Sequence, residues 1–143
     1  MQRPSEGLIY NYIRSAADKL RLRDWDIAYM VHEQPEAHKD PDQETYASVV
    51  PTYGTSADIR LSDSFFRLGA TDQRRILIHE LCHLHAHMFH HVAEQVEKAL
   101  EESPEGKEML RHILTEAEEH AVDQFARILA PSFPLPPWTG KNR

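Results

Sequence analysis

Apolar residues recur along the chain with two different periods, which predict helices and strands in alternation. From Ser5 to Leu20 the spacing is that of a helix, with an inward face made of Leu8, Ile9, Tyr12, Ile13, Ala16, Ala17 and Leu20. From residue 25 the period changes to two, with apolar positions at Trp25, Ile27, Tyr29 and Val31. This second pattern predicts a half-buried strand.

Turn residues separate the short elements that follow. The stretch from His32 to Glu44 is polar and contains two prolines, so we interpret it as a loop. Tyr46 to Val50 and Ala57 to Leu61 are predicted strands, joined by a turn over residues 51–56. Residues 62–68 are expected to form a brief helix before a glycine.

Two long helices are predicted in the second half of the chain. The first has Thr71 as its expected N-cap and an apolar stripe at Leu77, Leu81, Leu84 and Met88. The second begins with Ser103 as N-cap and Pro104 at its first position, and Pro131 ends it after Leu129. Its expected apolar side consists of Met109, Leu110, Ile113, Leu114, Ala117, Ala121, Val122, Phe125, Ile128 and Leu129.

The order of these elements predicts an α+β fold in which a small sheet of three or more strands packs against the first long helix. A chain of 143 residues with 41% hydrophobic residues can bury one core, so residues 1–143 are expected to form a single domain. Residues 131–143 are interpreted as an extended C-terminal tail that packs on the core, with a frayed end from Gly140. Ala57 to Leu61 is expected to be the sheet edge beside the candidate site described next.

The first long helix contains the sequence His79-Glu80-Leu81-Cys82-His83. Residues four apart lie one turn apart on the same helix face, so both imidazoles can reach one metal ion, and Glu80 stands beside them as a general base. His87 and His90 continue the same stripe. Because the pentapeptide also occurs by chance, a third ligand is needed before a catalytic Zn²⁺ site can be inferred.

The second long helix offers that ligand. Glu119 is the favoured candidate, because Asp123 lies one turn later and can accept a hydrogen bond from the far nitrogen of a metal-bound histidine. Glu116 is the main alternative, whereas Glu118 is expected to point elsewhere. Another divalent ion could use the same ligands.

These residues resemble a known family. The pair His79-Glu80-x-x-His83 and Glu119-x-x-x-Asp123 looks like the gluzincin pattern of zinc metallopeptidases, which implies that Glu119 is the third ligand and that Asp123 supports the site. The run from Glu119 to Pro131 is similar to the ending of ImmA/IrrE-type peptidases. Small zincin-like proteins of phage and prophages are similar in size and layout, and the resemblance covers about residues 45–131. It implies a minimal zincin-like fold.

Some features depart from related patterns. The metzincin extension requires glycine at 86 and histidine at 89, where this chain has Ala86 and Phe89, so that subclass is not expected. SprT-like proteases share a similar helix and use a third histidine as ligand. His87, His90 or His91 therefore remains an alternative third ligand.

The predicted function is hydrolysis of peptide bonds in a protein substrate by a zinc-activated water, with Glu80 as general base. Candidate donors to the developing oxyanion are His120, His112, His87, Tyr53 and Tyr46. The alternative is a zinc-binding interaction module in which another residue closes the fourth metal position. A carboxylate at position 80 has no use in such a closed site.

Charge and composition indicate which classes of partner and which cellular location to expect. A net charge of −7, with acidic residues concentrated at 94–119, argues against binding to nucleic acid. Cys82 is the only cysteine, so no intrachain disulfide forms, and we interpret it as a small buried apolar residue. No leader pattern or apolar run of membrane-spanning length is present, and we expect a cytoplasmic protein without a membrane partner.

Overall fold

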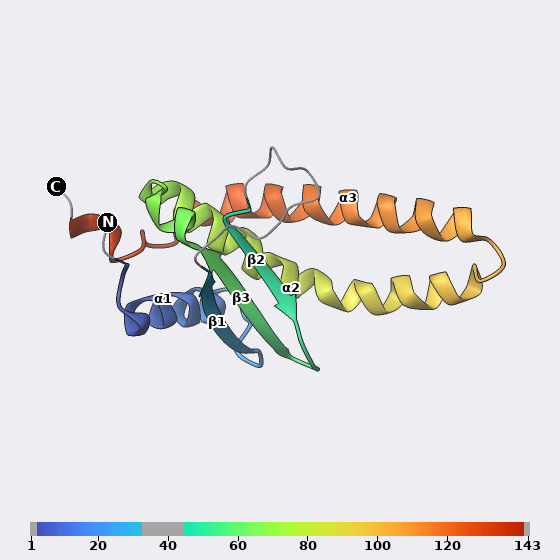
Figure 1. Cartoon of the computed structure of the whole chain (residues 1–143), viewed down its shortest axis with the longest axis horizontal. Coiled ribbons are helices and arrows are strands. Elements are labelled where there is room, and N and C mark those ends of the chain that lie inside the picture. Colours follow the sequence, from blue (N-terminus) through green and yellow to red (C-terminus); the bar gives the residue numbers. More distant parts are fainter. Residues whose placement is uncertain (1–2, 33–44, 142–143) are drawn as a thin grey trace.

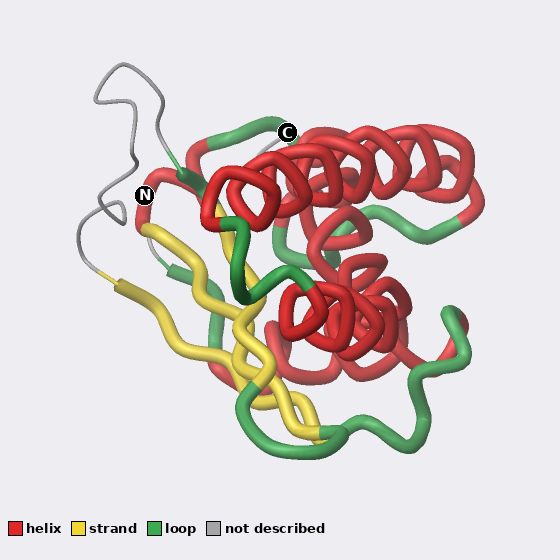
Figure 2. The backbone as a smooth tube through the Cα atoms, turned by 90° about the vertical axis from the view of Figure 1, so that its right-hand side faces the viewer, coloured by secondary structure: helices red, strands yellow, loops and turns green. Residues whose placement is uncertain are grey.

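The computed structural model of the chain describes residues 3–32 and 45–141, and the structural statements below refer to these residues. The predicted loop from His32 to Glu44 lies outside them except at His32, where the prediction is wrong because this residue ends β1. Figure 1 shows the elements in chain order: α1 (Glu6–Lys19), β1 (Asp26–His32), β2 (Ala47–Pro51), β3 (Ser56–Ser62), the 3-10 helix η1 (Asp63–Arg67), α2 (Ala70–Ala99), α3 (Pro104–Leu129), and two 3-10 turns, η2 (Ala130–Ser132) and η3 (Thr139–Lys141). The protein has the predicted α+β fold. Figure 2 shows the strands on one side of the molecule and the long helices on the other.

α1 matches the first predicted helix, with Ser5 at its N-cap and Leu20 at its C-cap. Its predicted inward face is correct except at Leu8, which is 38% exposed. Leu8 lies about 100° around the helix from Ile9, at the margin of the apolar arc, so it does not reach the core.

The sheet has the strand order β1-β3-β2, with β3 parallel to β1 and antiparallel to β2. The prediction that the strand at 57–61 forms the sheet edge is therefore wrong, because β3 is the central strand. Its inward residues Ala57, Ile59 and Leu61 are almost completely buried, as expected for a strand covered on both sides by neighbours. β2 is the edge strand that contacts α2. The turn before β3 contains Gly54 with φ of +56°, a conformation that favours glycine.

α2 begins earlier than the cap signal indicated. Gly69, rather than Thr71, is the N-cap residue, and Thr71 lies inside the first turn. Near this start, the buried side chain of Gln73 donates a hydrogen bond of 2.8 Å to the carbonyl oxygen of Leu68. Further along, Leu77, Leu81 and Leu84 form the expected buried stripe.

α2 and α3 form an antiparallel hairpin whose outer half extends beyond the sheet and α1 (Figure 1). α3 begins as predicted, with the Ser103 hydroxyl accepting a hydrogen bond from the backbone N–H of Gly106. Its apolar side differs from the prediction, because among the residues named for it only Val122 is fully buried. Where the hairpin extends beyond the sheet and α1, none of the other described elements lies over it (Figure 1).

The C-terminal segment packs on the core, as predicted. Phe133 and Pro136 are buried, and the carbonyl oxygen of Pro134 accepts a hydrogen bond of 2.7 Å from the Tyr12 hydroxyl. The indole N–H of Trp138 donates to the side-chain oxygen of Gln73 at 2.7 Å. The frayed end expected from residue 140 is wrong for residues 140–141, which belong to η3, while residues 142–143 lie outside the described part.

Two further sequence expectations concern Cys82 and the membrane. Cys82 is 5% exposed within the core, and burial raises the pKa of its thiol to about 11, which suits a packing role. None of the described helices combines the length and the apolarity that a membrane span requires.

The bond between Trp138 and Gln73 gives a prediction about stability. Trp138→Phe keeps an aromatic ring but leaves the buried Gln73 oxygen without its donor, which we expect to lower the free energy of unfolding by about 1–3 kcal/mol. Urea denaturation followed by circular dichroism measures the change. Leu135→Ala, in the same segment but 48% exposed, is the control. Equal stability of the two variants would show that the bond contributes little.

Candidate metal centre

Three side chains from the two long helices converge on one point. The Nε2 atoms of His79 and His83 lie 3.2 Å apart. Glu119 Oε2 lies 3.4 Å from His79 Nε2, and Glu119 Oε1 lies 3.1 Å from His83 Nε2. Tetrahedral ligands at about 2.0–2.1 Å from a zinc ion are separated by roughly 3.3 Å. The spacing of the donor atoms therefore fits a metal ion with three protein ligands.

The hairpin explains why these residues meet. His79 and His83 are one turn apart on α2 and project from the same face. The hairpin turns near residue 101; His83 lies 18 residues before that position and Glu119 lies 18 residues after it. In an antiparallel pair of helices, positions equidistant from the turn lie opposite each other. The structure thus brings together the three predicted metal ligands.

Glu80 lies on the sheet side of α2, beside the two histidines. Burial raises the pKa of its carboxyl group to about 7, although the histidines and the backbone N–H of Val49, which donates to it, act in the opposite direction. Val49 belongs to the edge strand β2. A carboxyl group with a pKa near neutrality can both accept and return a proton.

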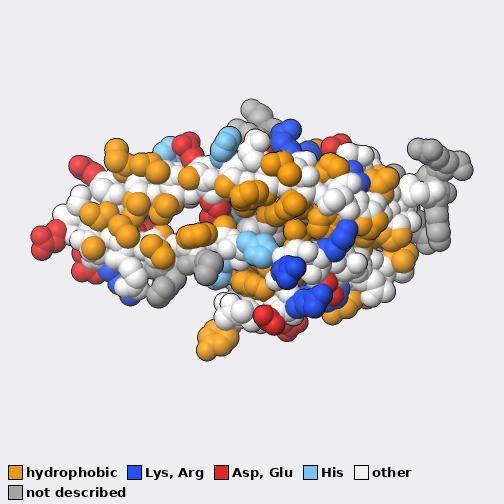
Figure 3. All heavy atoms as spheres, turned by 180° about the vertical axis from the view of Figure 1, so that it is seen from behind, with side chains coloured by type: hydrophobic (Ala, Val, Ile, Leu, Met, Phe, Trp, Pro, Cys, Tyr) orange, Lys and Arg blue, Asp and Glu red, His pale blue; other side chains and the backbone are white. Residues whose placement is uncertain are grey.

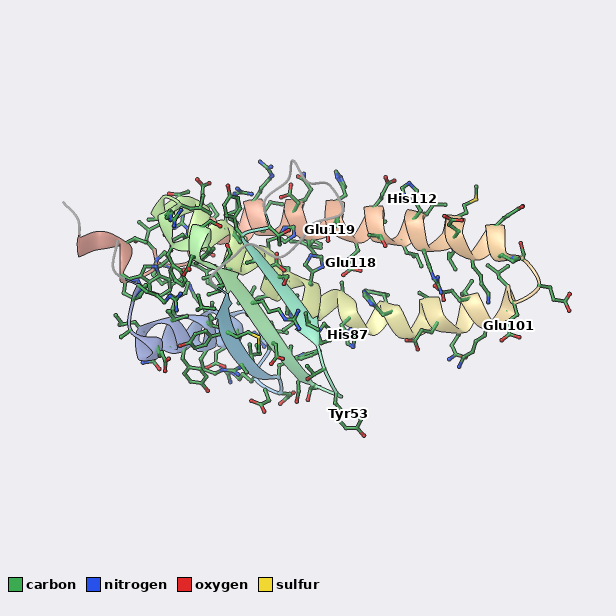
Figure 4. The ribbon with its side chains drawn as sticks, viewed as in Figure 1. Tyr53, His87, Glu101, His112, Glu118 and Glu119 are labelled. Carbon is green, nitrogen blue, oxygen red and sulfur yellow. The ribbon has the colours of Figure 1, made fainter. Side chains whose placement is uncertain are left out.

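Glu118 also belongs to the site, contrary to the expectation that it points elsewhere. One of its oxygens lies 2.9 Å from His83 Nδ1, and the other lies 2.8 Å from His90 Nε2. Figure 4 shows Glu118 and Glu119 on the side of α3 that faces α2. With Nδ1 directed at a carboxylate, Nε2 of His83 is the nitrogen available to a metal. The sequence could have indicated this position of Glu118, because the residue stands four residues from both Leu114 and Val122 and so lies on the apolar stripe of α3.

Asp123 lies on the predicted side of the site without making the predicted hydrogen bond. Its Oδ1 is 3.9 Å from His79 Nδ1, which exceeds hydrogen-bonding distance. Its Oδ2 accepts a hydrogen bond of 2.9 Å from Arg127. That bond is the main reason why the pKa of Asp123 is lowered. Asp123 therefore adds negative charge near His79 and is held by a neighbouring arginine.

The competing ligands lie elsewhere. Glu116 is on the exposed side of α3, where its carboxylate lies 3.2 Å from His112. His87 is packed edge-on against Trp25, with its buried Nδ1 lacking a partner among the described residues. His90 is engaged by Glu118, and the side chain of His91 lies outside the described part.

The candidate oxyanion donors are not assembled around the three ligands. Tyr53 is 90% exposed at the β2–β3 turn, and Figure 4 shows it and His112 directed away from Glu119. His120 is exposed on α3. Tyr46, beside β2, is half-buried and packs against the core.

The electrostatics of the three ligands favour a cation. Hydrogen bonds from both histidines lower the pKa of Glu119 well below its ordinary value. Burial acts to lower the pKa of His83, but hydrogen bonds to Glu119 and Glu118 outweigh it and raise this pKa to about 9. Without a metal, a proton on His83 partly balances the charge of the surrounding carboxylates. A divalent cation bound to the same atoms would replace that proton.

No protein-family model matches the chain, and no curated protein or solved structure is significantly similar to it. The metal centre is therefore inferred from the geometry and chemistry of the donor atoms alone.

The contact between Glu118 and His83 predicts a supporting role in metal binding. Glu118→Ala removes the acceptor that orients the His83 ring, and we expect the affinity for Zn²⁺ to fall about 10–100-fold. Competition with a chromogenic chelator measures this affinity. Glu116→Ala removes an exposed carboxylate two residues away on the same helix and should leave it unchanged. Equal affinities for the two variants would contradict the assignment of Glu118.

The raised pKa of His83 predicts a pH dependence of metal binding. His83 is protonated at neutral pH in the metal-free protein, and the metal must displace this proton. The affinity for Zn²⁺ should therefore rise with pH, roughly tenfold per unit, until the pH reaches about 9. Chelator competition at several pH values, corrected for the chelator's own protonation, tests this expectation. An affinity that stays constant from neutral pH upward would exclude it.

Proposed function

We propose that this protein is a zinc-dependent metallopeptidase that hydrolyses peptide bonds of a protein or peptide substrate. The observation that carries the proposal is the half-buried Glu80 beside three converging metal ligands, with the pKa of its carboxyl group raised to about 7. Three protein ligands leave a fourth position for water or substrate, as in catalytic rather than structural zinc sites. A structural site gains nothing from a carboxyl group of raised pKa next to its first histidine.

The chemistry follows from the placement of Glu80. A zinc ion held by His79, His83 and Glu119 would supply a Lewis acid and lower the pKa of a water molecule bound to it. Glu80 would accept a proton as water attacks the amide carbonyl and would then return it to the leaving nitrogen. Its pKa of about 7 suits both transfers near neutral pH.

The edge strand β2 offers a binding mode for an extended substrate. Tyr46 and Thr52 form backbone hydrogen bonds with β3, through Ser62 N–H to Tyr46 O and Thr52 N–H to Ser56 O. Because antiparallel pairing alternates, the backbone groups of Ala47 and Val49 point away from β3. The N–H of Val49 already donates to Glu80, which leaves the groups of Ala47 and the carbonyl oxygen of Val49 on this edge for a substrate. Among the described strands β2 has no other neighbour, so a peptide could pair with this edge.

The remaining parts of the proposal concern the setting of the protein. The resemblance of the run from Glu119 to Pro131 to the ending of ImmA/IrrE-type peptidases supports a specific protein substrate. The single buried cysteine fits a reducing, cytoplasmic location. The net charge of −7 disfavours nucleic acid as a partner.

The proposal is tested by measuring zinc content and cleavage of an unfolded, fluorescently labelled protein. We expect Glu80→Gln to keep the metal and to lose at least about 100-fold in cleavage rate, because it removes the general base and leaves the ligands intact. Glu119→Ala should lose metal affinity and, with it, activity. Glu116→Ala is the matched control for both and should resemble the parent.

Each result has a clear meaning. Cleavage by Glu80→Gln at the parent rate would exclude the proposed mechanism. Full zinc occupancy in Glu119→Ala would exclude Glu119 as a ligand. A parent protein that binds zinc and cleaves none of the substrates would favour the alternative, a zinc-binding interaction module.

A further inference from the structure

Glu118 contacts two histidines of α2, of which only one is a candidate metal ligand. Its Oε1 lies 2.9 Å from His83 Nδ1, and its Oε2 lies 2.8 Å from His90 Nε2. The two histidines are seven residues apart, which is about two helical turns, so both project from the same face of α2. These contacts form a chain of hydrogen bonds from His90 through Glu118 to the ligand His83.

The chemistry of these contacts determines which ring nitrogens carry a hydrogen. A carboxylate accepts hydrogen bonds and donates none, so His83 Nδ1 and His90 Nε2 each donate to Glu118. The hydrogen on His83 Nδ1 leaves Nε2 of the same ring for a metal. Each oxygen of Glu118 therefore has its own histidine, and the two histidines hold the carboxylate from two directions.

Glu118 also has space into which its carboxylate could turn. Together with His90 it lines a groove of about 930 Å³ between α2 and α3. Figure 3 shows hydrophobic side chains along both long helices and a hollow between them. A glutamate side chain has several rotatable bonds, so a single hydrogen bond beside open space leaves its carboxylate a choice of orientations. A second hydrogen bond restricts the carboxylate to the orientation that faces His83.

Two cationic side chains that line the same groove are already engaged within the chain. Arg111 donates to both carboxylate oxygens of Glu97, and Lys19 donates to a carbonyl oxygen of the C-terminal segment. Among the described residues, the hydrogen-bonding partners of Glu118 are the two histidines. His90 is therefore the group that holds the second oxygen of Glu118.

We propose that His90 is a positioning residue of the candidate metal centre, which holds Glu118 so that this carboxylate directs the His83 ring toward the metal. The role of His90 rests on the proposed function in one respect, because it requires a metal ion at the three ligands. It does not require that the protein cleaves peptides. Since His90 lies beyond His83 toward the hairpin tip, metal affinity would depend on the packing of the hairpin past the ligands themselves.

The affinity of the full chain for Zn²⁺, measured by competition with a chromogenic chelator, tests this role. His90→Leu should bind Zn²⁺ about three- to tenfold more weakly than the parent, a smaller loss than for Glu118→Ala because Glu118 still contacts His83 part of the time. His90→Gln retains an N–H donor at a similar distance from the backbone and should restore most of the affinity. Circular dichroism verifies that both variants are folded. Parent affinity in His90→Leu would overturn the proposal.

His112→Leu is the matched control. His112 is another exposed histidine beside a carboxylate, since its Nε2 lies 3.2 Å from Glu116 on the same helix. This pair does not contact His83, so its loss should leave the affinity for Zn²⁺ unchanged. An equal loss in His112→Leu and His90→Leu would show a general effect of charge and would contradict a specific role of His90.

A double-mutant cycle separates positioning from general stabilisation of the hairpin. If His90 acts through Glu118, His90→Leu should cause no further loss of affinity once Glu118→Ala is present. The same loss in both backgrounds would overturn the proposal. A parent that binds zinc but cleaves no substrate would contradict the peptidase function and leave the role of His90 to be decided by these affinities, whereas a parent that binds no zinc would overturn both.

Discussion

The antiparallel packing of α2 against α3 is the constraint on which the candidate site depends. It fixes the separation between two histidines on one helix and two consecutive glutamates on the other, with His83 in contact with both carboxylates. Such a group of charges is costly to desolvate unless its members neutralise one another. In the metal-free chain a proton on His83 contributes to this balance, and a divalent cation would contribute more. The same contact thus links the stability of the hairpin to the chemistry of the site.

Much of the arrangement could be predicted because local signals agree with it. Ser103 and Pro104 mark the start of α3 correctly, since a cap and a fixed φ act within one turn. The spacing of His79 and His83 sets their common direction in any helix. Once both helices and the turn between them are known, the position of Glu119 opposite His83 follows from equal distances to the turn.

Other features depend on packing that no local pattern encodes. α2 begins at Ala70, before the expected cap Thr71, and the buried Gln73 in its first turn is bound by the distant Trp138 as well as by Leu68. β3 is the central strand because it pairs with β1 on one edge and with β2 on the other. Its short sequence is compatible with either a central or an edge position. The prediction that Glu118 points away from the site is wrong. An acidic residue is usually solvated, whereas here two histidines from α2 bind its carboxylate.

The apolar stripe of α3 shows how a correct periodicity can lead to a wrong expectation about burial. The period requires that these residues face something apolar, but it does not say that this surface belongs to the same chain. Where α3 passes the core, Val122 and Ala126 are buried as in any globular protein. Phe125 lies between these two residues in the sequence but is 55% exposed, and Leu114, nearer the hairpin tip, is 39% exposed. An apolar stripe in a sequence therefore identifies which face of a helix is apolar, but how deeply each residue is buried depends on which elements lie over that face.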